Sequence, residues 1–251
     1  MIIIFILVII ILTIANIFLY KNIEKFEINP YFSEIYVINL KQDFKRWNVV
    51  KNDAEKQKLN IKRYNAVDGR KIDLNIPKYT NMFQSRKLKP SQKGCALSHI
   101  TLWDKIKQGN PEDNIIILED DAIIPKNFNV KLKKYLNQAP SNWDIIILGG
   151  NRFKGKYYTE NLIKPVINPY GNWGTFGYMI KRKTAYKLLI KCKSMKTTID
   201  HHLNLNYYSQ NNVFFCNPQL IKHDYNYYSN ILQKVRKDDS IKNNKIEIIK
   251  N

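Results

Sequence analysis

Three consecutive carboxylates, Glu119, Asp120 and Asp121, end an apolar run, Ile115 to Leu118, that has the length and composition of a buried strand. Acids buried at the end of a strand need a counter-charge. Because side chains alternate along a strand, Glu119 and Asp121 are expected to share one face while Asp120 points to the other. Mg²⁺ binds oxygen ligands, commonly one or two carboxylates plus substrate phosphates. The triplet therefore predicts a metal–diphosphate site, and an acidic strand-to-loop turn in solvent is the alternative.

From residue 34 onwards, apolar runs typical of strands alternate with patterns typical of helices. Strands are predicted at 34–40, 62–67, 115–119, 144–148 and 178–180, and helices at 42–59, 91–107 and 128–137, then through Leu189 and after Thr198. This alternation predicts an α/β fold with a mainly parallel sheet flanked by helices on both faces. Ligands of such sheets bind beyond the carboxyl ends of the strands. Polar residues and glycines at those ends are therefore expected to converge on one crevice: Asn39, Asp68, Glu119 to Asp121, and Gly149-Gly150.

The glycine-rich segment 168–177 places three glycines among aromatic residues. Glycines at this density are typical of a loop where the backbone approaches a ligand or another strand closely. We therefore predict a loop here, followed by the short strand at 178–180.

The N-terminal segment Ile2 to Tyr20 is almost wholly apolar. At about 1.5 Å per residue it nearly matches a hydrocarbon core of roughly 30 Å, which predicts a single membrane-spanning helix. A cleaved signal peptide is the weaker alternative, because no positively charged region directly follows Met1 and Tyr20-Lys21-Asn22 is not a small-residue cleavage site. The expected organisation is a membrane anchor at 1–20, a tether at 21–33, one folded domain at 34–233 and a polar tail at 234–251. The chain is accordingly expected to be a single-pass membrane protein, with its orientation left open.

The chain carries 41 Lys and Arg residues against 21 acidic ones, a formal net charge of +20. Such an excess favours a polyanionic partner: nucleic acid, a membrane surface or a phosphorylated substrate. Lys, Asn and Ile are abundant throughout, so a solvated basic surface is the alternative. The three cysteines, Cys95, Cys192 and Cys216, are far apart and indicate neither a zinc site nor a disulfide framework. A membrane-tethered nucleic-acid-binding protein, with 16 tyrosines available for stacking, is one competing reading.

Seven segments, in order, carry a family resemblance: IYVINLKQDFKRW (35–47), AVDGR (66–70), KGCALSHITLWDKI (93–106), IIILEDDAIIP (115–125), DIIILGG (144–150), GTFGYMIKRKTAYKLL (174–189) and TIDHHL (198–203). The chain resembles glycosyltransferase family 25, which contains bacterial lipooligosaccharide galactosyltransferases and collagen hydroxylysine galactosyltransferases. The resemblance implies a GT-A type fold, Mn²⁺ or Mg²⁺, and inverting transfer of a hexose from a UDP-sugar such as UDP-galactose. The implied acceptor is a hydroxyl of a glycan, a lipid-linked sugar or a hydroxylated peptide. A non-catalytic scaffold is the second competing reading, and the intact acidic triplet argues against it.

The resemblance also implies roles for the acidic triplet and for later residues. Glu119 and Asp121 would hold the metal, and His223 would complete its shell, with a lone surface histidine as the alternative. Asp120 would hold the ribose or a neighbouring backbone. Asp200 would be the general base that inversion requires, with an acid favoured by the positive end of a helix as the alternative.

The donor nucleotide would be held by the first and second motifs. Asn39, Leu40 and Arg46 belong to the opening motif, where Arg46 would contact a phosphate or form an ion pair with Asp43 or another acid. The turn Asp68-Gly69 would place its carboxylate on the base or a ribose hydroxyl, or serve simply as a turn. Ser98 and His99 lie on the predicted helix at 91–107, where the resemblance places them beside the donor sugar. A hydrogen-bonded structural histidine is the alternative for His99.

Overall fold

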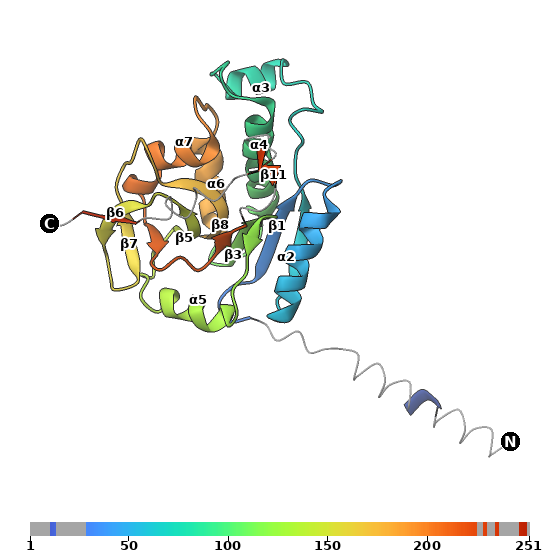
Figure 1. The fold of residues 1–251 in the computed structure, drawn as a ribbon, viewed down its shortest axis with the longest axis vertical. Coiled ribbons are helices and arrows are strands. Elements are labelled where there is room, and N and C mark those ends of the chain that lie inside the picture. The colour runs from blue at the N-terminus through green and yellow to red at the C-terminus, as the bar shows by residue number, and fades with distance from the viewer. Residues whose placement is uncertain (1–10, 14–28, 225–227, 230–233, 236–245, 250–251) are drawn as a thin grey trace. The chain divides into compact units, whose positions relative to one another are not determined.

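The computed structural model describes residues 11–13, 29–224, 228–229, 234–235 and 246–249 (Figure 1). The chain forms two compact units, Met1–Pro30 and Tyr31–Asn251. The sheet, the helices that cover it and every candidate site residue belong to the second unit.

The predicted N-terminal membrane-spanning helix is not supported. In the part of the chain that the structure describes, no helix combines the length and the apolar character needed to cross a bilayer. This finding overturns the predicted single-pass membrane localisation and the predicted membrane partner. Residues 11–13 are helical, and the rest of the predicted span at 2–20 lies outside the described residues.

A nine-stranded sheet forms the centre of the second unit, in the order β13-β6-β7-β9-β5-β8-β3-β1-β2. Its strands are β1 (Glu34–Asn39), β2 (Ile61–Asn65), β3 (Asn114–Glu119), β5 (Ile145–Asn151), β6 (Lys154–Tyr157), β7 (Leu162–Pro165), β8 (Trp173–Lys181), β9 (Val213–Cys216) and β13 (Glu247–Ile248). β1 runs parallel to β2 and β3, and β5 runs parallel to β9. β8, however, lies antiparallel between β3 and β5, and β7 is antiparallel to both β6 and β9. The prediction of a mainly parallel sheet is therefore wrong, and the described sheet is mixed.

Helices cover both faces of this sheet. They are α2 (Phe44–Lys56), α3 (Pro77–Met82), α4 (Pro90–Ile106), α5 (Phe128–Leu136), α6 (Arg182–Lys191) and α7 (Ile199–Asn206), followed by the 3₁₀ turn η1 (Tyr208–Gln210). Figure 1 shows α4, α6 and α7 on one face of the sheet and α5 on the other. Ile115 and Ile117 of β3 belong to the core layer of α4 and α6, whereas Ile116 and Leu118 belong to the layer of α2 and α5. Because side chains alternate and both faces are covered, the whole run is buried, each aliphatic side chain contributing about 1.5–3 kcal/mol.

The glycine-rich segment is partly a strand, which corrects the predicted loop: β8 begins at Trp173. Its glycines mark close packing instead. A Cβ on Gly177 would lie 2.9 Å from the Ile221 side chain, and one on Gly149 would lie 2.2 Å from the Ile221 carbonyl oxygen. These glycines therefore let the segment around Ile221 pack directly against β5 and β8.

A second close approach fixes the loop after β2 against the first turns of α4. A Cβ on Gly69 would lie 1.9 Å from the Pro90 carbonyl oxygen, and one on Gly94 would lie 2.5 Å from the Gly69 amide nitrogen. Ser98 links the same two segments, because its hydroxyl accepts from the Val67 amide at 2.8 Å and donates to the Gly94 carbonyl at 2.7 Å. This packing sets how far the Asp68-Gly69 turn stands from α4.

Replacing Gly94 with alanine should lower the free energy of unfolding by about 1–3 kcal/mol, because the new methyl group would overlap the Gly69 backbone. Thr101→Ala is the matched control, since it also introduces alanine into α4 but at an exposed position, where the change should be within about 0.5 kcal/mol. Urea unfolding of the two variants measures the difference. Equal stability of the two variants would show that the Gly69–Gly94 contact does not constrain the loop.

Candidate functional site

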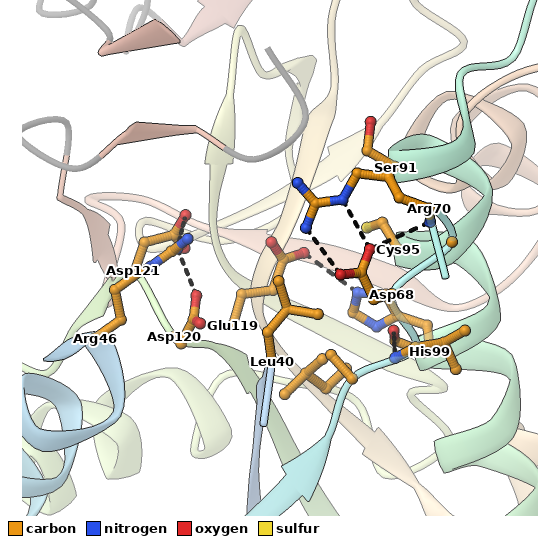
Figure 2. Close-up of a pocket in the computed structure, with 15 residues that line it drawn as sticks. Leu40, Arg46, Asp68, Arg70, Ser91, Cys95, His99, Glu119, Asp120 and Asp121 are labelled. Atoms are coloured by element: carbon orange, nitrogen blue, oxygen red, sulfur yellow. Dashed lines mark hydrogen bonds and ion pairs between the residues drawn. The ribbon is translucent and has the colours of Figure 1, made fainter. Parts of the chain in front are cut away.

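A pocket lies at the carboxyl ends of β1, β2 and β3, beside the N-terminal half of α4 (Figure 2). Most of the predicted site residues line it: Leu40, Arg46, Asp68, Gly69, Ser98, His99, Glu119, Asp120 and Asp121. Asn39, Asp200 and His223 are not among its lining residues, although Asn39 and His223 bond to residues that are. The structure therefore gathers residues from four separate motifs at one edge of the sheet.

Arg46 supplies the counter-charge that the acidic triplet requires. Its Nη2 lies 2.5 Å from Asp120 Oδ1 and 2.8 Å from Asp121 Oδ2, and all three side chains are largely buried. Burial opposes the charge on Arg46, but the carboxylates of Asp121 and Asp120 raise the pKa of the guanidinium above its ordinary value. Of the two roles predicted for Arg46, an ion pair with neighbouring acids is present, namely with Asp120 and Asp121.

Asp120 is held by Asn39 as well as by Arg46. The Asn39 side-chain amide donates to Asp120 Oδ2 at 2.6 Å and to the Asp43 carbonyl at 3.0 Å. Burial raises the pKa of Asp120 above its ordinary value; Arg46 acts against this rise, and the adjacent Asp121 adds to it. Asp120 is therefore a buried carboxyl, bonded to β1 and α2.

Arg63 of β2 in turn fixes the end of β1. Its guanidinium bonds to the Asn39 side-chain oxygen, at 2.8 Å through Nε, and its Nη2 donates to the Leu40 carbonyl at 3.2 Å. The guanidinium also lies over the rings of Phe44 and Trp47 of α2. Since the Asn39 oxygen is occupied by Arg63, its amide group must face Asp120.

Asp121 contacts a residue that is distant in sequence, His223. The two-residue strands β4 (Ala122–Ile123) and β10 (Lys222–His223) pair antiparallel, with His223 opposite Ala122. This ladder places His223 Nε2 at 2.9 Å from Asp121 Oδ2. Two ligands bound about 2.1 Å from an octahedral ion in adjacent positions are about 3 Å apart. The Asp121–His223 pair therefore has the spacing and the ligand types that fit a divalent cation.

Glu119 has different contacts from those of this pair. β3 ends at Glu119, and residues 120 and 121 form a turn, so the strand alternation used in the prediction does not extend to Asp121. Glu119 Oε1 accepts a hydrogen bond from the Thr175 hydroxyl at 2.6 Å and lies 3.2 Å from His99 Nε2. Figure 2 shows Glu119 directed towards α4, whereas Asp121 lies beside Arg46. The triplet thus divides into two groups of contacts.

His99 is fully buried in α4 and belongs to an extended network. Its Nδ1 lies 2.9 Å from the Tyr178 hydroxyl. The oxygen of this hydroxyl accepts a hydrogen bond from the Trp103 indole at 2.9 Å. Among the described residues, ligand atoms of Cys95, His99 and Glu119 lie within 4.8 Å of one another. Burial raises the pKa of the Cys95 thiol well above its ordinary value. The negative charges of Glu119 and Asp200 raise this pKa further, by smaller amounts.

Asp68 forms an ion pair within its own turn. Both its oxygens accept from the Arg70 guanidinium, at 2.8 and 2.9 Å, and Gln42 also donates to it. The Arg70 side-chain hydrogen bond lowers the pKa of Asp68 below its ordinary value, although burial acts against it. Asp68 therefore lines the pocket as a carboxylate that stays ionised at neutral pH.

Asp200 lies in the first turn of α7, outside the pocket lining. Its Oδ2 accepts from the Gly174 amide at 2.9 Å and its Oδ1 from the His201 amide at 2.8 Å. Thr198 is the N-cap residue of α7, but its side chain makes no capping hydrogen bond. Asp200 thus ties α7 to the start of β8, and its charge reaches the pocket residue Cys95.

Several residues of the site were not identified from the sequence. They include Arg63, Thr175 and Tyr178, as well as the pocket-lining residues Arg70, Ser91 and Cys95. Arg63 and Tyr178 lie on strands whose neighbours in the sheet are far away along the chain. Thr175 and Tyr178 fall inside the quoted segment 174–189, so the resemblance could have drawn attention to the segment but not to their contacts with Glu119 and His99.

Comparisons with known proteins agree with the ordered motifs. The family model described as "Glycosyltransferase family 25 (LPS biosynthesis protein)" matches residues 32–203. A human protein named "Procollagen galactosyltransferase 2" is 32% identical over 174 residues, which cover 63% of this chain and 27% of that protein. An Aedes aegypti protein named "Glycosyltransferase 25 family member" is 31% identical over 173 residues, covering 62% and 28%. The match therefore spans less than a third of the length of these relatives.

Among solved structures, the galactosyltransferase LgtC in complex with donor and acceptor sugar analogs aligns with a TM-score of 0.36 and 8% identity, over 72% of each chain. A197 from STIV aligns with a TM-score of 0.38 and 13% identity, over 87% of this chain and 98% of that one. Likeness at these TM-scores supports no argument, so the GT-A type of the fold stays a prediction.

Replacing Arg46 with methionine should lower the free energy of unfolding by about 3–5 kcal/mol in metal-free buffer, because two buried carboxylates lose their counter-charge. Lys51→Met is the matched control on α2: it removes an exposed pair with Glu55, 3.4 Å long, and should change stability by about 0.5 kcal/mol or less. Urea unfolding in the presence of EDTA measures both. A loss at Arg46 no larger than the loss at Lys51 would contradict its role as the counter-charge.

Proposed function

Because the chain belongs to glycosyltransferase family 25, we propose that it is a metal-dependent inverting glycosyltransferase with a GT-A type fold. It transfers a hexose, galactose in the first instance, from a UDP-sugar to a hydroxyl of a glycan, a lipid-linked sugar or a hydroxylated peptide. The observation that carries the proposal is the contact of Asp121 with His223, which joins a carboxylate and an imidazole across 102 positions of sequence at the carboxyl edge of the sheet.

The metal-binding part of the proposal is supported by the chemistry of the ligands. Asp121 and His223 would hold the cation, and Glu119 would add a carboxylate from the end of β3. Carboxylates suit Mg²⁺ and Mn²⁺, and the imidazole shifts the preference towards Mn²⁺. A bound cation would supply the Lewis-acid charge that stabilises the leaving diphosphate.

The donor-binding part is supported by the residues at the ends of β1 and β2. Leu40, Asp68 and Gly69 line the pocket, and the ionised Asp68 carboxylate is suited to accept from a ribose hydroxyl or a base. Asn39 and Asp120 support this part of the pocket, because their side chains are hydrogen-bonded to each other. Asn39 is also bonded by Arg63, and Asp120 by Arg46. Arg46 also lines the pocket, where its guanidinium can turn to a phosphate once a cation neutralises Asp121.

The hexose identity is proposed from the relatives, one of which is named "Procollagen galactosyltransferase 2". Ser98 lies on the α4 side of the pocket, where the donor sugar would rest, but its hydroxyl is fully engaged with the Val67 and Gly94 backbone. Ser98 would therefore shape the sugar pocket rather than bond to the sugar.

Inversion requires a base that takes the proton of the acceptor hydroxyl on the side opposite the leaving group. We assign this role to Asp200, whose charge reaches the pocket. Its two oxygens each accept a backbone amide hydrogen, which orients the carboxylate while leaving lone pairs on both oxygens for a hydroxyl proton.

The first test is release of UDP by the full-length chain, scanned over UDP-sugars with Mn²⁺ or with EDTA. One donor should be hydrolysed in a metal-dependent manner, and Asp121→Ala should lower that rate by at least about a hundredfold, since it removes a metal ligand. Asp104→Ala, which removes an exposed carboxylate of α4, is the control and should leave the rate unchanged.

A chain that keeps its fold but neither releases UDP nor is stabilised against heat by any donor would reject the proposed function. Equal hydrolysis with Mn²⁺ and with EDTA would reject the metal-dependent mechanism alone.

Asp200→Asn should lower hexose transfer to an acceptor by about 10²–10⁴-fold, because asparagine cannot accept the hydroxyl proton. Binding of Mn²⁺ and of the donor should be retained, since Asp200 lies outside the pocket lining. Transfer is measured with radiolabelled donor over acceptor panels, and donor binding by thermal shift. Normal transfer by the variant would return Asp200 to the alternative role, a structural acid at the start of α7.

A further inference from the structure

A chain of four side chains runs from the core to the pocket: Trp103, Tyr178, His99 and Glu119. The Trp103 indole lies 2.9 Å from the Tyr178 hydroxyl, the hydroxyl lies 2.9 Å from His99 Nδ1, and His99 Nε2 lies 3.2 Å from Glu119 Oε1. The first three side chains are almost completely buried. Polar groups at such depth must satisfy one another, because water is not available to them.

The hydrogen bonds among these four side chains have only one favourable donor-to-acceptor direction. An indole N–H only donates, so the Tyr178 oxygen accepts from Trp103. The Tyr178 hydroxyl hydrogen then has His99 Nδ1 as its acceptor, which makes Nδ1 the unprotonated nitrogen of a neutral ring. His99 Nε2 consequently carries the hydrogen and donates it to Glu119.

A second donor acts on the same oxygen of Glu119. The Thr175 hydroxyl donates to Oε1 at 2.6 Å, and both contacts of Glu119 among the described residues are made through Oε1. Two donors from two elements, α4 and β8, therefore fix the carboxylate plane and leave Oε2 for a ligand on the pocket side.

We propose that His99 is a positioning residue: through the Trp103–Tyr178–His99 chain it holds Glu119 in the orientation that presents Oε2 to the cation or donor in the pocket. The effect of this role on cation or donor binding rests on the proposed function. The direction of the hydrogen bonds does not, because it is a property of the protein itself. It differs from direct contact of His99 with the donor sugar.

The same direction of the hydrogen bonds prevents His99 from acting as a metal ligand. Cys95, His99 and Glu119 lie close enough together to suggest a metal site, but a metal on His99 Nε2 requires that nitrogen to be unprotonated. Moving the hydrogen to Nδ1 would leave the Tyr178 hydroxyl with two donors facing it and no described acceptor for its own hydrogen. Burial also keeps Cys95 in the thiol form, since it raises the pKa of that group.

The direct test is the tautomer of His99 in the full-length chain. The protein contains four histidines, so ¹⁵N-histidine labelling with two-bond ¹⁵N–¹H correlation gives four ring patterns, and the pattern lost in His99→Ala is that of His99. We expect a neutral ring with hydrogen on Nε2 at neutral pH, and a mixture of tautomers in Tyr178→Phe.

The second readout is the affinity for Mn²⁺, measured by titration calorimetry. His99→Ala and Tyr178→Phe should each weaken Mn²⁺ binding by about 10–100-fold, the usual effect of removing a partner that orients a metal ligand. Matched controls are His202→Ala, a buried histidine bonded to the Lys191 carbonyl, and Tyr207→Phe, whose buried hydroxyl has no hydrogen-bond partner among the described residues. Both controls should bind Mn²⁺ as the wild type does.

Hydrogen on Nδ1 of His99 in the wild type, or a doubly protonated ring, would overturn the proposal. So would Mn²⁺ affinities of folded His99→Ala and Tyr178→Phe variants that equal those of their controls. A wild-type protein that binds no Mn²⁺ would contradict the metal in the proposed function. The His99 tautomer would still decide the direction of the hydrogen bonds.

Discussion

The ion pairing of Arg46 with Asp120 and Asp121 is the interaction on which the site depends. Two carboxylates at the end of a buried strand would be strongly destabilising without a cation, because each loses the hydration that stabilises its charge. Arg46 sits on α2, so the pairing ties that helix to the end of β3. Asn39 completes the arrangement from β1. Arg46 therefore neutralises the acidic cluster in the absence of a metal. A bound metal would neutralise part of the same negative charge.

The acidic triplet is divided between two environments with different physical characters. Asp121 faces His223 at a short two-stranded ladder, a group of potential metal ligands. Glu119 contacts His99 and Thr175 through its Oε1. The division arises because β3 ends at Glu119 and the chain turns there. Asp121 thus contacts another potential metal ligand, whereas Glu119 is hydrogen-bonded by residues of α4 and β8.

The antiparallel placement of β8 explains how Thr175 reaches Glu119. Its register sets Tyr178 beside Ile117 and Gly177 beside Leu118, so that Thr175 lies just beyond the end of β3, next to Glu119. A parallel strand at this position would run in the opposite direction and would not bring the same residues to the carboxyl edge. The family resemblance and the geometry are complementary here. The motifs identify the segments that belong together, and the mixed sheet determines which of their side chains touch.

The sequence by itself determined the local elements and the family. The apolar run before Glu119 and the helix at 91–107 follow from burial and periodicity, which are properties of neighbouring residues. The ordered motifs carry the family resemblance, and the family model matches residues 32–203. The N-terminal apolar run did not lead to a membrane-spanning helix among the described residues. Only the tertiary structure decided that Arg46 pairs with Asp120 and Asp121, that His223 meets Asp121, and that the sheet is mixed. The contacts of Arg46 and His223 join residues more than 70 positions apart. Their formation, like the order of the strands, depends on how whole strands and helices pack, which no local pattern encodes.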